Sequence, residues 1–234
     1  MKTGTEKQIL GIVGGLGPQA SAEFLKTIYE YNIGDHEQDA PIVLLRSDPT
    51  FPDRTDSFLA GESEPLLARL TGSLQSLSDD GATRIVICCM TIHHLLPSVP
   101  AHLSARVISM LDVIFDNLKP PQRHLLLCSN GTRKLELFEN HPQWATHKSQ
   151  IVLPDDDDQE KIHRDLIYPI KQNPDFSRLK VLLETLLKRY EVDSFIAGCS
   201  EIHVLAKHLV FNGNRAGYAC LDPLMIIARR WERG

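Results

Sequence analysis

Two cysteines lie in matching sequence contexts and are the residues of this chain best placed for chemistry. Cys89 follows the apolar run RIVIC and Cys199 follows SFIAG, and a histidine, His93 or His203, comes four residues after each. A cysteine between a strand and a helix lies near the positive end of the helix dipole, which lowers its thiol pKa below about 8.5 and favours the thiolate. Two such sulfurs on opposite sides of one carbon could remove a proton from one face and return it to the other, as in a racemase or epimerase.

The two cysteines belong to an internal repeat of the chain. RIVICCMTIHHLL at 84–96 resembles DSFIAGCSEIHVL at 193–205, with isoleucine, histidine and leucine at the same distances after each cysteine. The similarity extends to Asp112 and Asp222, which lie equally far beyond the two cysteines. Because chance would not carry the same spacing through to a second strand, the repeat predicts two related α/β halves. Each half places one cysteine at the carboxyl end of a parallel strand, where open α/β sheets bind ligands.

The elements that must position these cysteines alternate between short apolar runs and helix-like segments. Strands are expected, in chain order, at 8–13, 41–46, 84–89, 106–110, 123–128, 149–154, 194–199 and 217–222. Helical spacing is expected over 18–32, 64–81, 157–171 and 176–190. Such alternation is typical of parallel sheets covered by helices. We therefore predict an α/β fold of two similar open domains, related by a pseudo-two-fold axis. Each has a parallel four-stranded sheet flanked by helices, and the active site lies in the cleft between them.

The repeat also predicts where the two domains divide. The first domain is expected to contain residues 1–105 plus 218–234, so that the last strand and helix return to the first half. The second domain is expected to contain residues 106–217. Gly15 and Gly131, in glycine-containing turns, begin the matching halves.

The composition is that of an ordinary globular protein and argues against several classes. The chain has 234 residues, of which 42% are hydrophobic and 24% charged, and its net charge of -5 favours neither nucleic-acid nor membrane binding. Five cysteines cannot all pair in disulfides, and no apolar run reaches the roughly 18 residues of a membrane span. With no signal-peptide pattern at the start, we expect a cytoplasmic protein with reduced thiols.

Three other interpretations of these motifs remain open. Cys89 and Cys199 could be packing residues, although their matching positions at turns favour a functional role. With His93 and His203 they would also make a plausible zinc set, although a cysteine and a histidine four residues apart are equally one face of a helix. GLGPQA at 15–20 fits a dinucleotide-binding glycine turn, but the acidic residue expected about 20 residues later is not there.

Polar residues near the strand ends favour an acidic substrate. Arg54 lies in the proline-rich loop DPTFPDR, where its guanidinium could hold a carboxylate through two hydrogen bonds. Thr91, Thr132 and Ser200 lie in turns after strands, where hydroxyls and backbone N–H groups could hold a second carboxylate. Taken singly, each hydroxyl residue is more often a helix cap, and Lys171 is an ordinary helix-end lysine by spacing alone.

With these motifs together, nearly the whole chain resembles the cofactor-independent aspartate/glutamate racemase family, and within it the aspartate racemases. GIVGGLGP resembles the family's N-terminal glycine turn, DPTFPDRT its Pro-Asp-Arg loop, CCMTIHH its first cysteine motif and AGCSEIHVL its second. The resemblance implies interconversion of L- and D-aspartate by a thiol and a thiolate, without pyridoxal phosphate or metal, in a homodimer. The Pro-Asp-Arg loop argues against the hydantoin racemases and maleate isomerases of the superfamily.

The resemblance also assigns roles to individual residues. Cys89 and Cys199 match the catalytic cysteines, and Arg54 matches the arginine that binds the side-chain carboxylate. Substrate contacts are further expected, in chain order, at Gly15, Met90, Thr91, Thr132, Lys171, Ser200 and Glu201. Cys88, Cys128 and Cys220 are expected to be packing residues.

Met90 departs from the family pattern, which has asparagine after the first cysteine. A methionine side chain cannot donate hydrogen bonds to a carboxylate. Either the backbone N–H or Asn130 takes its place, or the activity is altered. The alternatives that stay open are a racemase of glutamate or another acidic amino acid, and a non-catalytic ligand-binding α/β relative.

Overall fold

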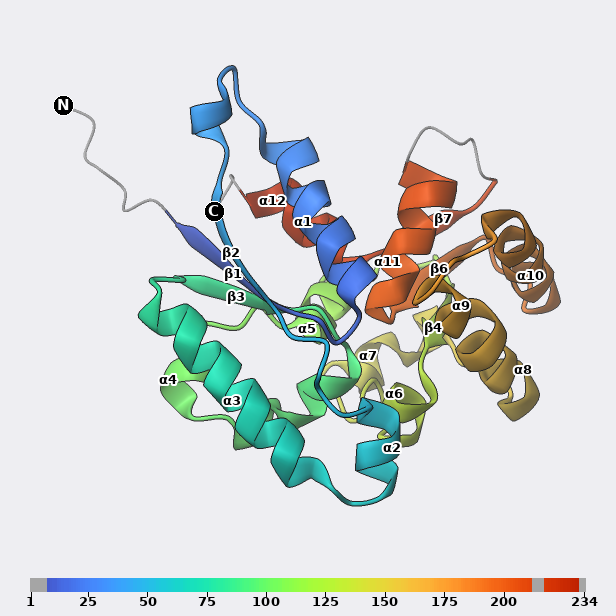
Figure 1. Cartoon of the computed structure of the whole chain (residues 1–234). Helices are drawn as coiled ribbons and strands as arrows, with labels where there is room; N and C mark the ends of the chain where they lie inside the picture. The colour runs from blue at the N-terminus through green and yellow to red at the C-terminus, as the bar shows by residue number, and fades with distance from the viewer. Residues whose placement is uncertain (1–7, 212–216, 232–234) are drawn as a thin grey trace.

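The computed structural model describes residues 8–211 and 217–231 and contains two parallel sheets side by side (Figure 1). The first sheet has the strand order β2-β1-β3, and the second has the order β5-β4-β6-β7. The strands are β1 (Ile9–Gly14), β2 (Ile42–Ser47), β3 (Arg84–Ile87), β4 (His124–Cys128), β5 (Ile151–Val152), β6 (Ser194–Gly198) and β7 (Ala219–Leu221). The predicted α/β class, with two parallel sheets flanked by helices, is confirmed.

Helices cover both sheets. Around the first sheet lie α1 (Pro18–Asn32), α2 (Arg54–Leu59), α3 (Ser63–Asp79), α4 (Ala101–Ser104), α5 (Met110–Phe115) and α12 (Pro223–Arg230). Around the second lie α6 (Asn130–Lys134), α7 (Trp144–His147), α8 (Asp156–Lys161), α9 (Tyr168–Ile170), α10 (Phe176–Arg189) and α11 (Ser200–Ala206). Short 3-10 or π-type segments are η1 (Glu37–Asp39), η2 (Thr91–Ser98), η3 (Lys148–Gln150), η4 (Ile162–Ile167) and η5 (Lys207–Phe211).

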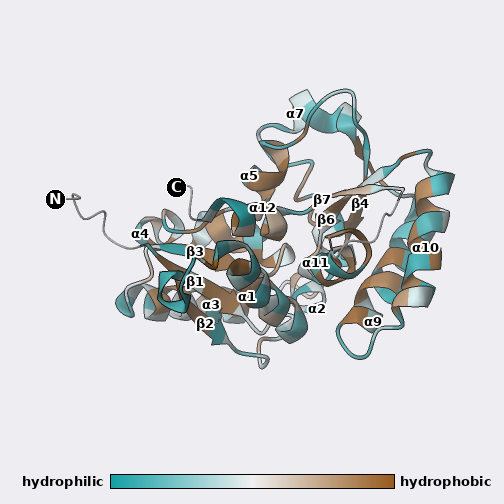
Figure 2. Ribbon diagram, turned by 90° about the horizontal axis from the view of Figure 1, so that it is seen from above, coloured by the Kyte–Doolittle hydropathy of each residue, from teal (hydrophilic) through white to brown (hydrophobic). Residues whose placement is uncertain are grey.

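The apolar runs predicted as strands are buried because helices shield both faces of each sheet. In β1, Leu10 and Ile12 pack with α1, α5 and α12, while Val13 packs on the opposite face with α3. A third cluster joins the second sheet to η4, α10 and α11. Figure 2 shows the apolar sides of these helices turned towards the sheets. The strands are therefore fixed from both sides, and their carboxyl ends are held rigidly.

The segment 106–110, predicted as a strand, does not form one, and the first sheet has three strands rather than the predicted four. Of the segment 106–110, only Val107 pairs with the sheet, through an isolated bridge to Ile85. Two residues later the Ser109 side chain accepts a hydrogen bond from the backbone N–H of Asp112 and begins α5. Because the helix cap follows the bridge so closely, no strand can form there. The segment leads into α5 instead.

The predicted division expected the last strand to return to the first half, but it does not. β7 pairs with β6 in the second sheet. Asp222 then caps α12, and this helix does pack against α1 and α5 of the first half. The chain thus crosses between the halves at Asp222, and the exact domain limits stay a prediction.

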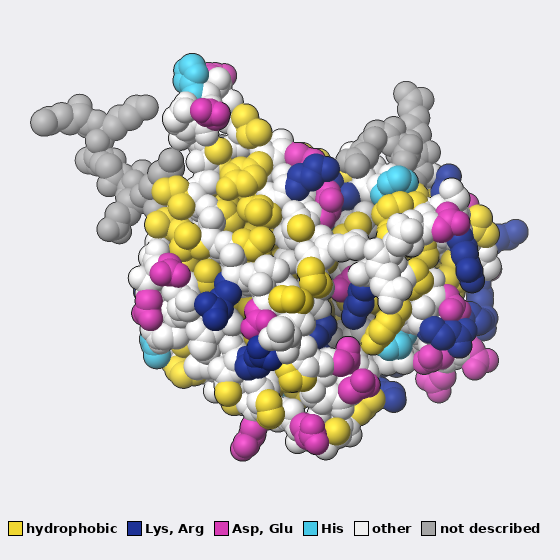
Figure 3. Space-filling model, in the orientation of Figure 1, with side chains coloured by type: hydrophobic (Ala, Val, Ile, Leu, Met, Phe, Trp, Pro, Cys, Tyr) yellow, Lys and Arg dark blue, Asp and Glu magenta, His cyan; other side chains and the backbone are white. Residues whose placement is uncertain are grey.

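The surface of the molecule has an apolar region and a charged region. Among the described helices, none combines the length and the apolar character needed to cross a bilayer. Figure 3 shows apolar side chains gathered over α1 and β2, where Tyr31, Ile33 and Ile42 are exposed. Acidic and basic side chains are instead mixed over α8 to α10 (Figure 3).

Candidate active site

Both predicted catalytic cysteines line one cavity between the two sheets. Cys89 lies in the turn between β3 and η2, and Cys199 is the N-cap residue of α11, directly after β6. Only 8% of Cys89 and 9% of Cys199 is exposed. The cavity has a volume of about 20 Å³, which is room for about one water molecule. The repeat therefore delivers two thiols to one closed space at the carboxyl ends of parallel strands.

Six of the residues predicted for the site line this cavity. They are Arg54, Cys89, Thr91, Lys171, Cys199 and Glu201. The other four, Thr132, Ser200, Gly15 and Met90, are not among its lining residues. Seven further lining residues were missed by the sequence analysis, namely Leu16, Asp53, Thr55, Ser129, His163, Ile167 and Tyr168.

Arg54, at the start of α2, is anchored by the backbone and keeps one donor free. Its guanidinium donates hydrogen bonds to the carbonyl oxygens of Pro52, at 3.0 Å, and Leu16. Its Nε is buried and has no hydrogen-bond partner among the described residues. Burial opposes the charge, but the neighbouring Cys89 and Asp53 raise the Arg54 pKa above its ordinary value. The side chain is thus an anchored cation beside Cys89 with one N–H group that has no partner among the described residues.

Cys199 has an acidic neighbour instead. Its Sγ donates to Oε2 of Glu201 at 2.8 Å, and Glu201 is only 4% exposed. Burial, and then the Glu201 carboxyl group, raise the Cys199 pKa well above its ordinary value, while Lys171 acts in the opposite direction. The predicted lowering of this pKa by the helix dipole is therefore wrong for Cys199. A seven-residue helix does not outweigh burial and an adjacent carboxylate.

Three hydroxyl groups form a triangle beside Cys89. Thr91 Oγ1 lies 2.9 Å from both Ser129 Oγ and Thr132 Oγ1, and the last two lie 3.2 Å apart. Ser129 caps α6 by accepting a hydrogen bond from the Thr132 backbone N–H. Thr91 and Ser129 line the cavity, while Thr132 stands behind and orients them. The turn sequence SNGT was the available signal for Ser129, because it follows β4 as the cysteine motifs follow β3 and β6.

Lys171 and its neighbours form the wall contributed by η4 and α9. Lys171 Nζ lies 4.5 Å from the centre of the Tyr168 ring. Burial opposes its charge, but Glu201 and Cys199 raise the Lys171 pKa. The Tyr168 ring in turn meets the His163 ring edge-to-face at 4.8 Å. A second cation therefore faces the cavity from the Cys199 side.

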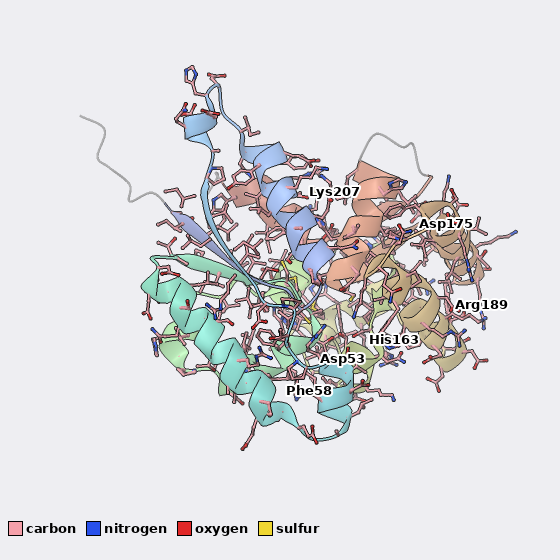
Figure 4. The ribbon with its side chains drawn as sticks, in the orientation of Figure 1. Asp53, Phe58, His163, Asp175, Arg189 and Lys207 are labelled. Carbon is pink, nitrogen blue, oxygen red and sulfur yellow. The ribbon has the colours of Figure 1, made fainter. Side chains whose placement is uncertain are left out.

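His163, on η4, lines the same cavity as Asp53, and the two residues lie near each other in Figure 4. The backbone N–H of Asn130 donates to its Nδ1 at 3.3 Å, which leaves Nε2 as the N–H donor. Partial burial lowers the His163 pKa, and the carboxylates of Glu160 and Asp53 only partly offset this. Nothing in the periodicity of the sequence distinguishes His163 from a surface histidine.

The two histidines of the repeat point away from the cavity. His93 Nδ1 donates to the Cys89 carbonyl oxygen at 2.8 Å, while the Met110 backbone N–H donates to Nε2 at 3.4 Å. Burial lowers the His93 pKa to about 4, so the ring is neutral. Both ring nitrogens are therefore occupied and cannot join Cys89 in binding a metal.

His203 has different partners. Its Nδ1 lies 2.6 Å from Asp222 Oδ2 and its Nε2 lies 3.1 Å from Thr27 Oγ1. The Thr27 hydroxyl already donates to the Glu23 carbonyl oxygen at 2.7 Å, so it accepts from the ring. Within the described part of the chain, no group of three or more histidine, cysteine or acidic side chains is arranged to hold a metal ion. The geometry thus does not support the zinc interpretation.

The glycine turn carries Leu16, which lines the cavity, and its glycines approach other parts of the chain closely. Gly15 has a φ of +87°, and a Cβ there would lie 2.3 Å from the backbone of Asp48. A Cβ on Gly17 would lie 2.2 Å from Oε1 of Glu201. Gly15 therefore permits a tight turn, and Gly17 lets Glu201 pack against the backbone.

Met90 lies in the core, where 1% of it is exposed, so only its backbone is near the site. The side chain of Asn130, which was expected to compensate for it, donates to Glu160 at 2.8 Å and is engaged elsewhere. Cys88, Cys128 and Cys220 do not line the cavity. The donors left for a substrate carboxylate on the Cys89 side are thus hydroxyls, backbone N–H groups and Arg54.

Comparisons with known proteins agree with this geometry. The chain is 22% identical over 213 residues to a broad-specificity amino-acid racemase of Bacillus subtilis (strain 168), covering 86% of this chain and 88% of that protein. Its fold is similar to the Picrophilus torridus aspartate racemase, with a TM-score of 0.78, 22% identity and coverage of 94% and 91% of the two chains. An aspartate racemase homologue from Pyrococcus horikoshii OT3 gives a TM-score of 0.66, 19% identity and coverage of 97% and 98%.

The family comparison covers both cysteine motifs and the loop that carries Arg54. The model of the Asp/Glu/hydantoin racemase family matches residues 13–229, which is nearly the whole chain. Two thiols that face one cavity from related halves are what a two-sided proton transfer requires. The chain is therefore a member of the Asp/Glu/hydantoin racemase family.

Proposed function

We propose that this protein is a racemase of acidic amino acids, with aspartate as the preferred substrate, that uses Cys89 and Cys199 as the two proton-transfer groups. The observation that carries the proposal is the pair of buried thiols on one cavity with opposite electrostatic neighbours. Arg54 stands beside Cys89, while Glu201 accepts a hydrogen bond from Cys199 at 2.8 Å. Such neighbours give one base and one acid in the same resting site.

The roles of the two thiols are assigned from these neighbours. We assign the first base to Cys89, because the Arg54 cation lies beside it, and the first acid to Cys199, because burial and Glu201 raise its pKa well above the ordinary value. Cys89 then removes the α-proton of one enantiomer, and Cys199 donates its proton to the opposite face of the carbanion. The product enantiomer leaves Cys89 as thiol and Cys199 as thiolate, which is the state that accepts the reverse reaction.

Substrate binding uses the groups that the chain leaves unsatisfied. The free Nε of Arg54 and the ammonium of Lys171 hold the distal carboxylate. The hydroxyls of Thr91 and Ser129, with nearby backbone N–H groups, hold the α-carboxylate. Fixed donors at the α-carboxylate stabilise the negative charge that develops when the α-proton leaves. Because the two thiols supply both proton transfers, this scheme needs no pyridoxal phosphate or metal.

The small cavity requires the walls to move when substrate enters. A volume of about 20 Å³ cannot hold an amino acid. Asp53, the N-cap residue of α2, and His163 on η4 both line the cavity, so we expect α2 and η4 to be the walls that move. Closure over the substrate would exclude water and strengthen each charge interaction inside the site. We further expect a cytoplasmic homodimer with no nucleic-acid or membrane partner.

The test is incubation of the purified protein with L-aspartate in deuterated water. We expect loss of the α-proton NMR signal together with formation of D-aspartate, followed by chiral chromatography. L-Glutamate and the neutral amino acid L-asparagine serve as parallel substrates, and the bystander variant Cys128→Ser should keep the activity.

The outcomes separate the alternatives. Exchange with all three substrates at equal rates would replace the acidic specificity with broad specificity. A preference for glutamate would change the substrate but keep the mechanism. Absence of exchange at high protein concentration with every substrate would favour a non-catalytic ligand-binding relative, the interpretation that Met90 keeps open.

A further inference from the structure

A second cavity lies between α5 and α12, on the opposite side of the core from the thiols. Its volume is about 250 Å³, somewhat below the range of about 300–1,000 Å³ that holds drug-sized ligands. Its walls are apolar and include Val113 of α5, Ile226 and Ile227 of α12, and Trp231. It shares no lining residue with the site of the two cysteines. It is therefore a separate space of the size of a small organic molecule.

Two arginines give this apolar cavity a positive rim. Arg84, at the start of β3, and Arg230, at the end of α12, both line it and are exposed. Within residues 8–211 and 217–231, neither arginine forms an ion pair with an acidic side chain, and Arg230 donates only to Asn117, at 2.7 Å. An apolar interior whose mouth carries two guanidinium groups, neither paired with an acidic side chain of the described residues, complements a molecule with an apolar body and one carboxylate.

The two helices that form this cavity, α5 and α12, each contact the histidine of one cysteine motif. α5 begins at Met110, whose N–H donates to His93, and α12 is capped by Asp222, which binds His203. Each of these histidines follows its cysteine by four residues. α5 and α12 also pack against each other, between the two sheets (Figure 2). A molecule bound between these helices would therefore affect the contacts of His93 and His203, the histidines that follow the two thiols.

We propose that the cavity between α5 and α12 binds a small apolar carboxylate, and that its occupation changes the reactivity of Cys89 and Cys199 through His93 and His203. The binding site stands without any assumption about catalysis. The effect on proton transfer rests on the proposed racemase function. Such coupling requires that the ligand prefer one of two arrangements of the helices.

Binding is tested with phenylacetate and the fluorescence of Trp231, in a Trp144→Phe background that removes the only other tryptophan. We expect a saturable change in fluorescence, and at least tenfold weaker binding of the neutral analogue phenylacetamide. Val113→Phe fills the cavity and should abolish binding. Arg84→Met should weaken it about tenfold, which is the loss of one charge-assisted hydrogen bond. Arg178→Met, an exposed arginine on α10, is the matched control and should bind as the parent does.

Coupling is tested with two readouts. Saturating phenylacetate should change the rate of iodoacetamide labelling of Cys199, measured by mass spectrometry, at least twofold, and the rate of deuterium exchange into aspartate by a similar factor. Neither change should occur in Val113→Phe, which separates this site from phenylacetate bound at the thiols.

Each result decides one part of the proposal. Absence of saturable binding, or equal binding of phenylacetamide, overturns the carboxylate site. Binding with an unchanged labelling rate overturns the coupling. Absence of deuterium exchange in every sample overturns the racemase function alone, because fluorescence and labelling do not depend on it.

Discussion

The two cysteine motifs share one repeated sequence pattern but have opposite electrostatic surroundings. The position two residues after the cysteine is Thr91 in the first half and Glu201 in the second. Thr91 contributes a hydroxyl to a hydrogen-bonded triangle, while Glu201 accepts a hydrogen bond from Cys199. This one difference within the repeat therefore places a carboxyl group beside Cys199, whereas the charged group beside Cys89 is Arg54.

The histidines differ in the same way. His93 accepts a backbone N–H group through Nε2, whereas both nitrogens of His203 face oxygen acceptors. Asp222 supplies one of these acceptors, but its counterpart in the first half, Asp112, binds His141 at 2.9 Å instead. The comparison teaches that the repeat keeps the positions of the two thiols, while a few polar partners give the two thiols different surroundings.

The sharpest test of this asymmetry is to remove each thiol in turn. Cys199→Ser and Cys89→Ser should each lower racemisation of aspartate by about 10³-fold, within the range for loss of a general acid or base. Each variant should still exchange deuterium into one enantiomer without inverting it, because the remaining thiol returns a solvent-derived proton to the same face. The two variants should retain exchange with opposite enantiomers, measured by NMR on L- and D-aspartate separately.

Retention of exchange with the same enantiomer in both variants would break the comparison, since the thiols would then not act on opposite faces. Near-normal racemisation by Cys199→Ser would exclude the two-thiol scheme altogether. Cys88→Ser serves as the control, because Cys88 is adjacent to Cys89 but is buried and does not line the cavity.

The histidines provide a second test, through stability. Because burial lowers the His93 pKa from 6.5 to about 4, the unfolded chain binds more protons than the native protein between these pH values. The free energy of unfolding should therefore fall as the pH falls through this window, by about 3 kcal/mol from His93 alone. Urea denaturation at pH 7 and pH 4.5 should show a smaller fall for His93→Gln than for the wild type, with His102→Gln on the exposed surface as control. An equal fall in His93→Gln would show that this ring is not held neutral.

Much of this arrangement could be predicted from the sequence, and the limits have physical reasons. Long apolar runs at 8–13 and 194–199 identified buried strands, and the repeat identified Cys89 and Cys199, because such signals are local in sequence. The raised pKa of Cys199 could not be predicted from helix position alone, because burial and the contact between Cys199 and Glu201 exist only after folding. His163 was missed for the same reason, since its role depends on where η4 packs.

The segment 106–110 shows a different limit. Its apolar pattern fits a short strand and a helix start equally well, and periodicity alone cannot separate the two. The cap formed by Ser109 decides the outcome in favour of α5. Similarly, an apolar run at 217–222 predicts a strand but not the sheet that it joins, because pairing with β6 is a long-range choice.

A third test compares the two cations of the site, Arg54 beside Cys89 and Lys171 on the Cys199 side. Arg54→Met removes the free Nε donor and should lower kcat/KM for aspartate, relative to asparagine, by roughly thirtyfold, or about 2 kcal/mol. Lys171→Met should have a smaller effect on this ratio, because the Lys171 ammonium already contacts the Tyr168 ring, whereas Arg54 Nε has no partner among the described residues. An equal loss for both substrates in Arg54→Met would show that the arginine serves Cys89 alone and does not hold the distal carboxylate.

The smallest change addresses the residue on which the asymmetry depends. Glu201→Gln keeps the shape of the side chain but removes the carboxylate that, after burial, raises the Cys199 pKa most. The thiolate fraction of Cys199 at pH 8 should rise, and a lowering of its pKa by one unit gives about tenfold faster labelling by iodoacetamide. Labelling of Cys89 in the same sample, resolved by mass spectrometry, should change much less, because the Arg54 guanidinium beside it is unchanged. If both thiols react faster to the same extent, Glu201 acts on the whole cavity, and the division into an acid half and a base half must come from burial rather than from the residue that follows each cysteine.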